Sequence, residues 1–320
     1  MLNLSPNKKP KKSDRTKKTK TDLNIKEFDL KHASQCFPKK YSDADKIKYG
    51  RTLVIAGSRN VYGACFFAAK SALMSGAGMI RIVTHINNRL PLTRDLPEAM
   101  FSFYRWIVSG KRMESALNWA DSVVIGPGLS TGGKAGRLLK LTIERIKAGS
   151  VLIIDADAIN ILSTDGVLFK ALVSAVKDKK LRAVITPHKG ELGRLKNHLK
   201  IVDLDDDEAA AYIYNNYNIA VVRKGERTVS LAGEVYINTT GNEGMATAGS
   251  GDVLSGILGG MLHRTDSHSL AEGVALSVFI HGLCGDLAAS KRNSMSVTAS
   301  DIMNEIPAAL DRVERYAESP

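Results

Sequence analysis

The chain has 320 residues, a formal net charge of +12 and 44% hydrophobic residues, a composition typical of a globular protein. Its three cysteines lack CxxC spacing, so neither a disulfide framework nor a structural zinc site is predicted, and we expect a reducing, cytoplasmic environment. We also expect no membrane span and no secretory signal, because neither a run of about 18 apolar residues nor an apolar N-terminal segment occurs.

The positive charge is concentrated at the N-terminus. The first 20 residues contain eight lysines and arginines and one aspartate, which leaves a net charge of only +5 for the remaining residues. Such a segment cannot bury enough apolar surface to offset its ordering entropy, so we expect residues 1–22 to form a disordered tail. Mobile lysines bind nucleic acid only through salt-sensitive, non-specific contacts, so a nucleic-acid function is disfavoured. Residues 23–320 are predicted to form a single domain.

Short β-branched runs alternate with longer helical patterns from residue 50 onward. The predicted strands cover residues 52–56, 79–83, 122–125, 151–154, 183–185, 219–222 and 228–231. Helices are predicted at about 63–76, 133–148, 167–177 and 206–216, and three more between residues 249 and about 315. Near-continuous apolar strands separated by helices are typical of a parallel sheet covered on both faces. The sequence therefore predicts an α/β protein with a central, mostly parallel sheet flanked by helices.

A glycine-rich segment at residues 249–252 is the strongest candidate for chemistry. Gly249, Ser250 and Gly251 stand at the start of a predicted helix, where backbone N–H groups converge and the helix dipole favours an anion. Asp252 lies in the first turn, where the dipole should keep it ionised, and it could accept a proton from an attacking hydroxyl. The alternative is that Asp252 only caps the helix.

A second glycine loop competes for the same phosphate-binding role. Residues 128–134 match the G-x-x-x-x-G-K pattern between a strand and a helix, but Ala135 replaces the Ser or Thr that would bind magnesium. Asp155 could then act as a second magnesium ligand, together with Asp157, although Asp157 also suits the N-cap of a helix entered at Ala158. The histidines at 263, 268 and 281 lack metal-ligand spacing, so no protein metal site is predicted.

Seven segments in a fixed order give the sequence a specific resemblance. They lie at residues 54–58, 62–64, 126–128, 155–160, 186–191, 224–225 and 244–252, and the matching region runs from about residue 48 to 306. Together they resemble the ADP- or ATP-dependent NAD(P)H-hydrate dehydratases, a metabolite-repair family with the ribokinase-like fold. The resemblance implies a ribokinase-like three-layer sandwich.

The resemblance also implies a reaction and its residues. The hydroxyl of hydrated NADH or NADPH, in the S epimer, would be phosphorylated by ADP or ATP with Mg²⁺, and phosphate would then leave. Asp252 would be the base and contact the hydrate. The other expected contacts are Ala64, Gly128 and His188 with the hydrate, and Lys224, Gly225, Glu226, Arg227, Thr228 and Gly251 with the nucleotide.

Several properties follow only from the resemblance. It suggests a homotetramer and, from the Gly-Ser-Gly-Asp pattern, the ADP-using branch of the family. Epimerisation of the hydrate would need a separate protein. Two alternatives stay open: a ribokinase-like kinase of a small alcohol such as a vitamin precursor, and a catalytically idle nucleotide-binding or nucleic-acid-associated module that uses the basic tail.

Overall fold

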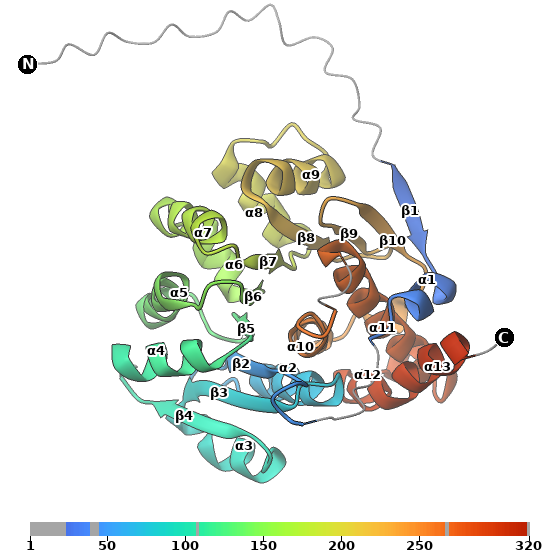
Figure 1. The fold of residues 1–320 in the computed structure, drawn as a ribbon, viewed down its shortest axis with the longest axis horizontal. Coiled ribbons are helices and arrows are strands. Elements are labelled where there is room, and N and C mark those ends of the chain that lie inside the picture. Colours follow the sequence, from blue (N-terminus) through green and yellow to red (C-terminus); the bar gives the residue numbers. More distant parts are fainter. Residues whose placement is uncertain (1–23, 39–44, 107–108, 266–268, 319–320) are drawn as a thin grey trace, which may run out of the picture.

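A single sheet runs through the protein (Figure 1). The computed structural model describes residues 24–38, 45–106, 109–265 and 269–318, and the predicted tail at residues 1–22 lies outside these ranges. The strand order in the described part is β1-β10-β9-β8-β7-β6-β5-β2-β3-β4. The strands are β1 (Ile25–Phe28), β2 (Arg51–Ile55), β3 (Met79–His85), β4 (Met100–Tyr104), β5 (Ser122–Ile125), β6 (Val151–Ile154), β7 (Arg182–Ile185), β8 (Ile219–Arg223), β9 (Val229–Leu231) and β10 (Val235–Asn238).

The sheet confirms the predicted fold class and all seven predicted strands. Strand β9 is antiparallel to β8 and β10, and the other pairings are parallel. The prediction missed β1, β4 and β10. Strands β1 and β4 lie at the two edges of the sheet, where their side chains are largely exposed or half-buried. Strand β1 (IKEF) contains two charged residues and lacks the continuous apolar run by which a central parallel strand is recognised. Strands β4 (MFSFY) and β10 (VYIN) are largely apolar, but they were not among the predicted strands.

Helices cover both faces of the sheet (Figure 1). They are α1 (Leu30–Gln35), α2 (Gly63–Met74), α3 (Arg89–Asp95), α4 (Gly110–Trp119), α5 (Gly133–Arg145), α6 (Asp157–Leu162), α7 (Gly166–Asp178), α8 (Lys189–Leu199), α9 (Asp206–Tyr217), α10 (Ser250–Met261), α11 (Leu270–Ser290), α12 (Ala299–Asn304) and α13 (Ile306–Glu318). Short 3-10 turns lie at Ile86–Asn88, Glu243–Met245 and Ser294–Ser296.

The four predicted helices before residue 249 are confirmed, but the count of three after it is wrong. Helices α10, α11, α12 and α13 occupy that segment. Pro307 explains the break between the last two, because proline has no N–H to donate to a carbonyl of the preceding turn. Helices α1, α3, α4 and α8 were also missed, and two of these four have only six or seven residues. Helix α6, expected to be entered at Ala158, begins at Asp157.

Two hydrophobic cores lie on opposite faces of the sheet. Alternate strand residues point to opposite faces, so Val54 packs with α2, α10 and α11, while Leu53 and Ile55 pack with α4 to α9. Helix α11 has the length and, with a mean hydropathy of 1.4, the apolarity of a membrane span. In the protein 72% of that stretch is buried, so it serves as a core helix.

Glycines bring α10 unusually close to α2. A Cβ atom added at Gly256 would lie 2.3 Å from the Ala68 carbonyl oxygen, and one at Gly260 would lie 2.4 Å from that of Ala72. Neither distance is sterically possible, so only glycine permits this approach. The contact fixes the position of α10, whose N-terminus carries Asp252.

We predict that Gly260→Ala destabilises the protein by about 1–3 kcal/mol, because its methyl group would overlap the α2 backbone. The measurement is urea unfolding followed by circular dichroism. The matched control is Gly136→Ala in α5, where an added Cβ meets nothing within 4 Å. This control should be more stable by about 0.5–1 kcal/mol, since alanine favours a helix over glycine. Equal stability of the two variants would contradict close packing of α2 and α10.

Candidate active site

The predicted site residues gather at one edge of the sheet. They follow the carboxyl ends of β2, β5, β6, β7 and β8, which are parallel and neighbouring, and the N-terminus of α10 completes the edge. This is the position at which open α/β sheets bind ligands.

The phosphate loop has the backbone geometry that the sequence predicted. Gly249 takes the left-handed conformation with φ of +93°, and an added Cβ would lie 2.9 Å from both the Phe67 ring and Ala299. Helix α10 begins at Ser250 and has no side-chain cap. The Ser250 N–H donates to the Thr247 carbonyl over 3.3 Å, so the amides of Gly251 and Asp252 in the first turn are the ones that can bind an anion. The alternative role of Asp252 as a helix cap is therefore wrong, because Gly249 is the N-cap residue.

His281 supports this loop from α11. Its Nε2 lies 3.0 Å from the Ser250 carbonyl oxygen and 3.3 Å from Ser250 Oγ. Burial lowers the pKa of His281 to about 4, so the imidazole is neutral near pH 7. The protonated Nε2 donates to the carbonyl and holds Ser250 in place. No role was predicted for His281, because no local motif connects it to Ser250, which lies 31 positions away in the sequence.

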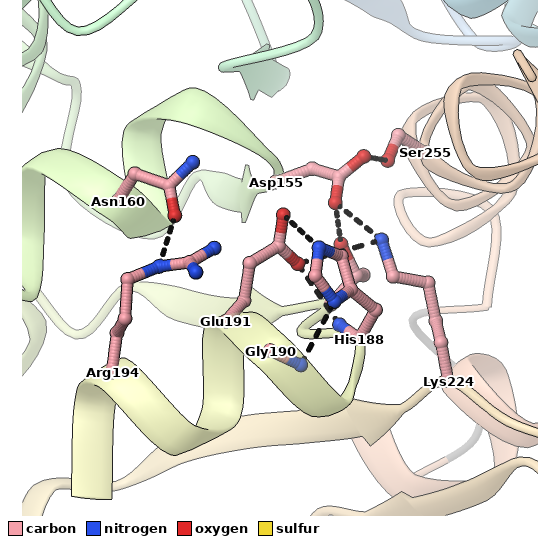
Figure 2. Close-up of polar contacts among 9 residues, drawn as sticks. Asp155, Asn160, His188, Gly190, Glu191, Arg194, Lys224 and Ser255 are labelled. Atoms are coloured by element: carbon pink, nitrogen blue, oxygen red, sulfur yellow. Dashed lines mark hydrogen bonds and ion pairs between the residues drawn. The ribbon is translucent and has the colours of Figure 1, made fainter. Parts of the chain in front are cut away.

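Asp155 and Lys224 form a buried ion pair at the centre of the site (Figure 2). Lys224 Nζ donates to Asp155 Oδ1 over 2.8 Å, Thr186 donates to the same oxygen, and Ser255 donates to Asp155 Oδ2. Burial alone would raise the pKa of Asp155, but the Lys224 charge and these hydrogen bonds outweigh it and lower the pKa. Asp155 is therefore a firmly ionised anion inside the protein.

Glu191 and His188 extend this network (Figure 2). Glu191 Oε2 lies 3.9 Å from Lys224 Nζ and accepts from the His188 backbone N–H, while burial raises the Glu191 pKa. His188 Nδ1 accepts from Gly190 N–H, and its Nε2 lies 3.3 Å from Glu191 Oε1. His188 is thus the N-cap of α8, and its side chain remains 54% exposed at the site. It has a structural role and is also accessible to a ligand.

Asp252 lies in the electric field of this network. The pKa of Asp252 is raised to about 7: burial and the charges of Asp155 and Asp157 raise it, and the charge of Lys224 opposes them. The expectation that the helix dipole keeps Asp252 fully ionised is therefore wrong. Near pH 7 this carboxyl exists in both protonation states, which is the condition that favours a general base.

The remaining predicted residues fall into two groups. An added Cβ at Gly128, where φ is +57°, would lie 2.9 Å from the Ala64 Cβ, so Ala64 and Gly128 are neighbours. Ala64 precedes Cys65, whose pKa is raised by burial and by the charge of Asp252. Two of the expected hydrate-binding residues, Ala64 at the start of α2 and Gly128 after β5, therefore lie next to each other.

The loop between β8 and β9 carries the second group, residues 224–228. Thr228 Oγ1 donates to the Gly225 carbonyl over 3.2 Å, and Glu226 and Arg227 are exposed. A Cβ added at Gly251 would lie 3.4 Å from Lys224 Nζ. The expected nucleotide loop and the phosphate loop therefore meet at the Lys224 ammonium group.

Two alternatives from the sequence are not confirmed. Asp157 is the first residue of α6 and its Oδ2 accepts from Ser130 N–H over 2.7 Å, while Ala156 is the N-cap. Lys134 of the G-x-x-x-x-G-K pattern donates to the Arg105 carbonyl and lies over the Trp106 ring. This second glycine loop contributes Gly128 to the site.

The site does not form a dedicated protein cage for a metal ion. Both oxygens of Asp155 already accept hydrogen bonds from Lys224, Thr186 and Ser255. Within the described ranges, no three His, Cys, Asp or Glu side chains are grouped to hold an ion. Magnesium that accompanies a nucleotide takes most of its ligands from phosphate oxygens and water, which this site permits.

The fold and the phosphate loop define a ribokinase-like α/β protein. A ribokinase-like superfamily protein from Enterococcus faecalis superposes with a TM-score of 0.76 at 27% identity, covering 90% of this chain and 96% of that one. The ADP/ATP-dependent NAD(P)H-hydrate dehydratase of Bacillus subtilis, co-crystallised with ATP/Mg²⁺, has the same fold, with a TM-score of 0.76 at 24% identity. The superposition covers 91% of this chain and 100% of the Bacillus chain.

The chain belongs to the NAD(P)H-hydrate dehydratase family, whose sequence model matches residues 52–308. The ADP-dependent (S)-NAD(P)H-hydrate dehydratase of Listeria monocytogenes is 31% identical over 274 residues, which are 85% of this chain and 92% of that protein. The bifunctional NAD(P)H-hydrate repair enzyme of Moorella thermoacetica is 34% identical over 294 residues, 88% of this chain. The chain spans only about half, 53%, of that longer relative.

We predict that Asp155→Asn lowers the free energy of unfolding by about 3 kcal/mol at pH 7, because Lys224 loses its buried counter-charge. The lowered pKa of Asp155 means that its contribution is present above the ordinary value of 3.8 and is lost as the pH falls through the folded-state pKa. Urea unfolding should therefore show the gap between variant and wild type shrinking below about pH 4.

The control for this variant is Asp311→Asn, which makes the same chemical change in the exposed ion pair between Asp311 and Arg315. It should change the stability by no more than about 0.5 kcal/mol. Equal losses of unfolding free energy in the two variants would show that the ion pair between Asp155 and Lys224 does not stabilise the protein more than an exposed ion pair does.

Proposed function

We propose that this protein is an ADP-dependent dehydratase that restores NADH and NADPH from their S hydrates. The observation that carries the proposal is the position of Asp252, a carboxyl with a pKa of about 7 in the first turn behind an uncapped phosphate loop and within the field of Lys224. Membership of the family and the ADP-dependent relatives support this choice of substrates.

The first step is transfer of a phosphoryl group to the hydrate. The hydroxyl oxygen attacks the terminal phosphorus of ADP, a new O–P bond forms, and the bond to the leaving AMP oxygen breaks. Asp252 accepts the hydroxyl proton as that oxygen becomes nucleophilic. The amides at Gly249 and Gly251 stabilise the charge that develops on the phosphoryl oxygens, and one well-placed donor contributes about 3 kcal/mol.

The second step is elimination. The ring C–O bond breaks, phosphate leaves with the electron pair, and loss of a proton from the neighbouring ring carbon restores the double bond. Hydroxide is a poor leaving group and phosphate is a good one, so cleavage of the nucleotide drives the dehydration. Lys224 can stabilise the departing phosphate because its own pKa is raised: burial would lower it, but Asp155 and Glu191 outweigh burial.

Magnesium is proposed to enter with the nucleotide, where it would neutralise phosphate charge. The homotetramer, the cytoplasmic location and the use of a separate epimerase stay predictions. Relatives such as the Moorella protein are described as bifunctional, so an epimerising activity can also occur in the same chain as a dehydratase.

The direct experiment incubates purified protein with hydrated NADH or NADPH, magnesium and either ADP or ATP. Recovery of absorbance at the reduced-nicotinamide band, together with released phosphate, supports the proposal, and a higher rate with ADP supports the choice of donor. Accumulation of a stable phosphate ester of a small alcohol, with no recovery from the hydrates, would instead identify a kinase.

We predict that Asp252→Asn lowers kcat by about 10²- to 10⁴-fold, because the amide cannot accept the hydroxyl proton. The dissociation constant for ADP should change little, since the phosphate loop and the 224–228 loop remain. The variant should be no less stable than wild type above pH 7, because burial disfavours the ionised carboxyl in the folded protein. A normal rate in this variant would show that Asp252 is not the base.

We predict that kcat/KM falls about tenfold per pH unit below pH 7, because the protonated Asp252 cannot act as a base. Nucleotide phosphates also titrate near this pH, so a second variant is needed. Asp157→Asn removes a charge that raises the Asp252 pKa, and it should move the acid limb to lower pH without affecting the nucleotide. If kcat/KM of Asp157→Asn falls at the same pH as that of wild type, the group that titrates is not Asp252.

A further inference from the structure

A separate cavity of about 390 Å³ lies between the end of β4 and helix α5. Tyr104, Leu138 and Leu141 form apolar walls, and Trp106, Lys134 and Arg137 complete the lining. Its volume is near the lower end of the range for small-molecule pockets. The cavity therefore suits one end of a long ligand better than a whole dinucleotide.

Trp106 is the unusual residue of this cavity. Its side chain is 71% exposed, although a tryptophan gains much by burial. Lys134 Nζ lies 5.0 Å from the centre of its ring. An exposed indole beside an apolar cavity offers a flat face on which an aromatic base can stack.

The cavity is positively charged. Arg137 has no ion-pair or hydrogen-bond partner within the described part of the chain, and Lys134 donates to a backbone carbonyl. None of the described residues that line the cavity carries a negative charge. His85, whose ring contacts Tyr104, has its pKa lowered first by burial and then by the charges of Lys134, Arg59 and Arg105. Several cations thus act on this one region.

The cavity lies at the same edge of the sheet as the proposed active site, because it is lined by Tyr104 at the end of β4 and by Gly133 at the start of α5. Gly128, expected to contact the hydrate, follows β5, and the chain from it enters α5 at Gly133, which lines the cavity. Strand β4 is three places from β5 in the order β5-β2-β3-β4, which is about 14 Å at the usual strand spacing. Two riboses and a pyrophosphate can bridge such a separation.

We infer that this cavity binds the adenosine end of the hydrated dinucleotide, with the adenine stacked on Trp106 and the phosphates near Lys134 and Arg137. The inference rests on the proposed function, because it is the nicotinamide end of the same molecule that would react at Asp252. The apolar walls favour a base, the exposed indole favours an aromatic one, and the unpaired cations favour a ligand with phosphate groups. A nucleotide is the chemical class that combines these features.

The test compares Trp106→Ala with wild type in the turnover of hydrated NADH and of hydrated reduced nicotinamide mononucleotide, which lacks the adenosine half. Loss of one stacked base should raise KM for hydrated NADH about five- to 150-fold and leave kcat unchanged. KM for the mononucleotide and for ADP should not change. The matched control is Leu90→Ala on α3, since Leu90 is 81% exposed and does not line the cavity.

Each of the other outcomes would contradict either the proposed function or the assignment of the cavity to the adenosine end. Failure of wild type to turn over hydrated NADH would contradict the proposed function itself. Normal wild-type turnover with an unchanged KM in Trp106→Ala would overturn the adenosine site alone. A raised KM for ADP would assign the cavity to the phosphoryl donor, and a changed sedimentation coefficient with unchanged KM would assign it to contact between copies of the chain.

Discussion

The arrangement of the site depends on one ammonium group held among carboxylates. Lys224 Nζ lies 2.8 Å from Asp155 and 3.9 Å from Glu191, and its charge also reaches Asp252. Without this cation, three acidic groups at one partly buried sheet edge would repel one another and could not all be ionised. With it, Asp155 remains an anion, whereas burial and the charge of Asp155 raise the pKa of Asp252 to about 7. Neighbouring carboxyls with separated pKa values are the usual basis of distinct acid and base roles.

The sequence predicted the central sheet well because burial on both faces leaves a clear pattern. Strands β5 and β6 begin and end where the apolar runs 122–125 and 151–154 do. The rule that ligands bind beyond the carboxyl ends of strands then placed Gly128, His188 and Lys224 at one edge. Elements with little apolar pattern, such as the edge strand β1 and the polar helix α8, were missed.

The contacts that tune the site could not be predicted from the sequence. Asp155 meets Lys224 across 69 residues and Ser255 across 100, and no local pattern specifies which hydroxyl or ammonium will face a given carboxylate. His281 shows the same limit, because its link to Ser250 exists only through the packing of α11 on α10. His188 shows a different one. The sequence indicated only an expected ligand contact for His188, whereas its side chain both caps α8 and remains exposed at the site.

The close approach of α10 to α2 has a consequence for how donor preference can change during evolution. Gly256 and Gly260 leave α10 no room to slide or tilt, so the phosphate loop cannot adjust its position to a shorter or longer polyphosphate. The β8–β9 hairpin has more freedom, because Gly225, Glu226 and Arg227 are exposed. Substitutions that exchange one phosphoryl donor for another are therefore expected to accumulate in this hairpin, while the glycine pattern of the helix is retained.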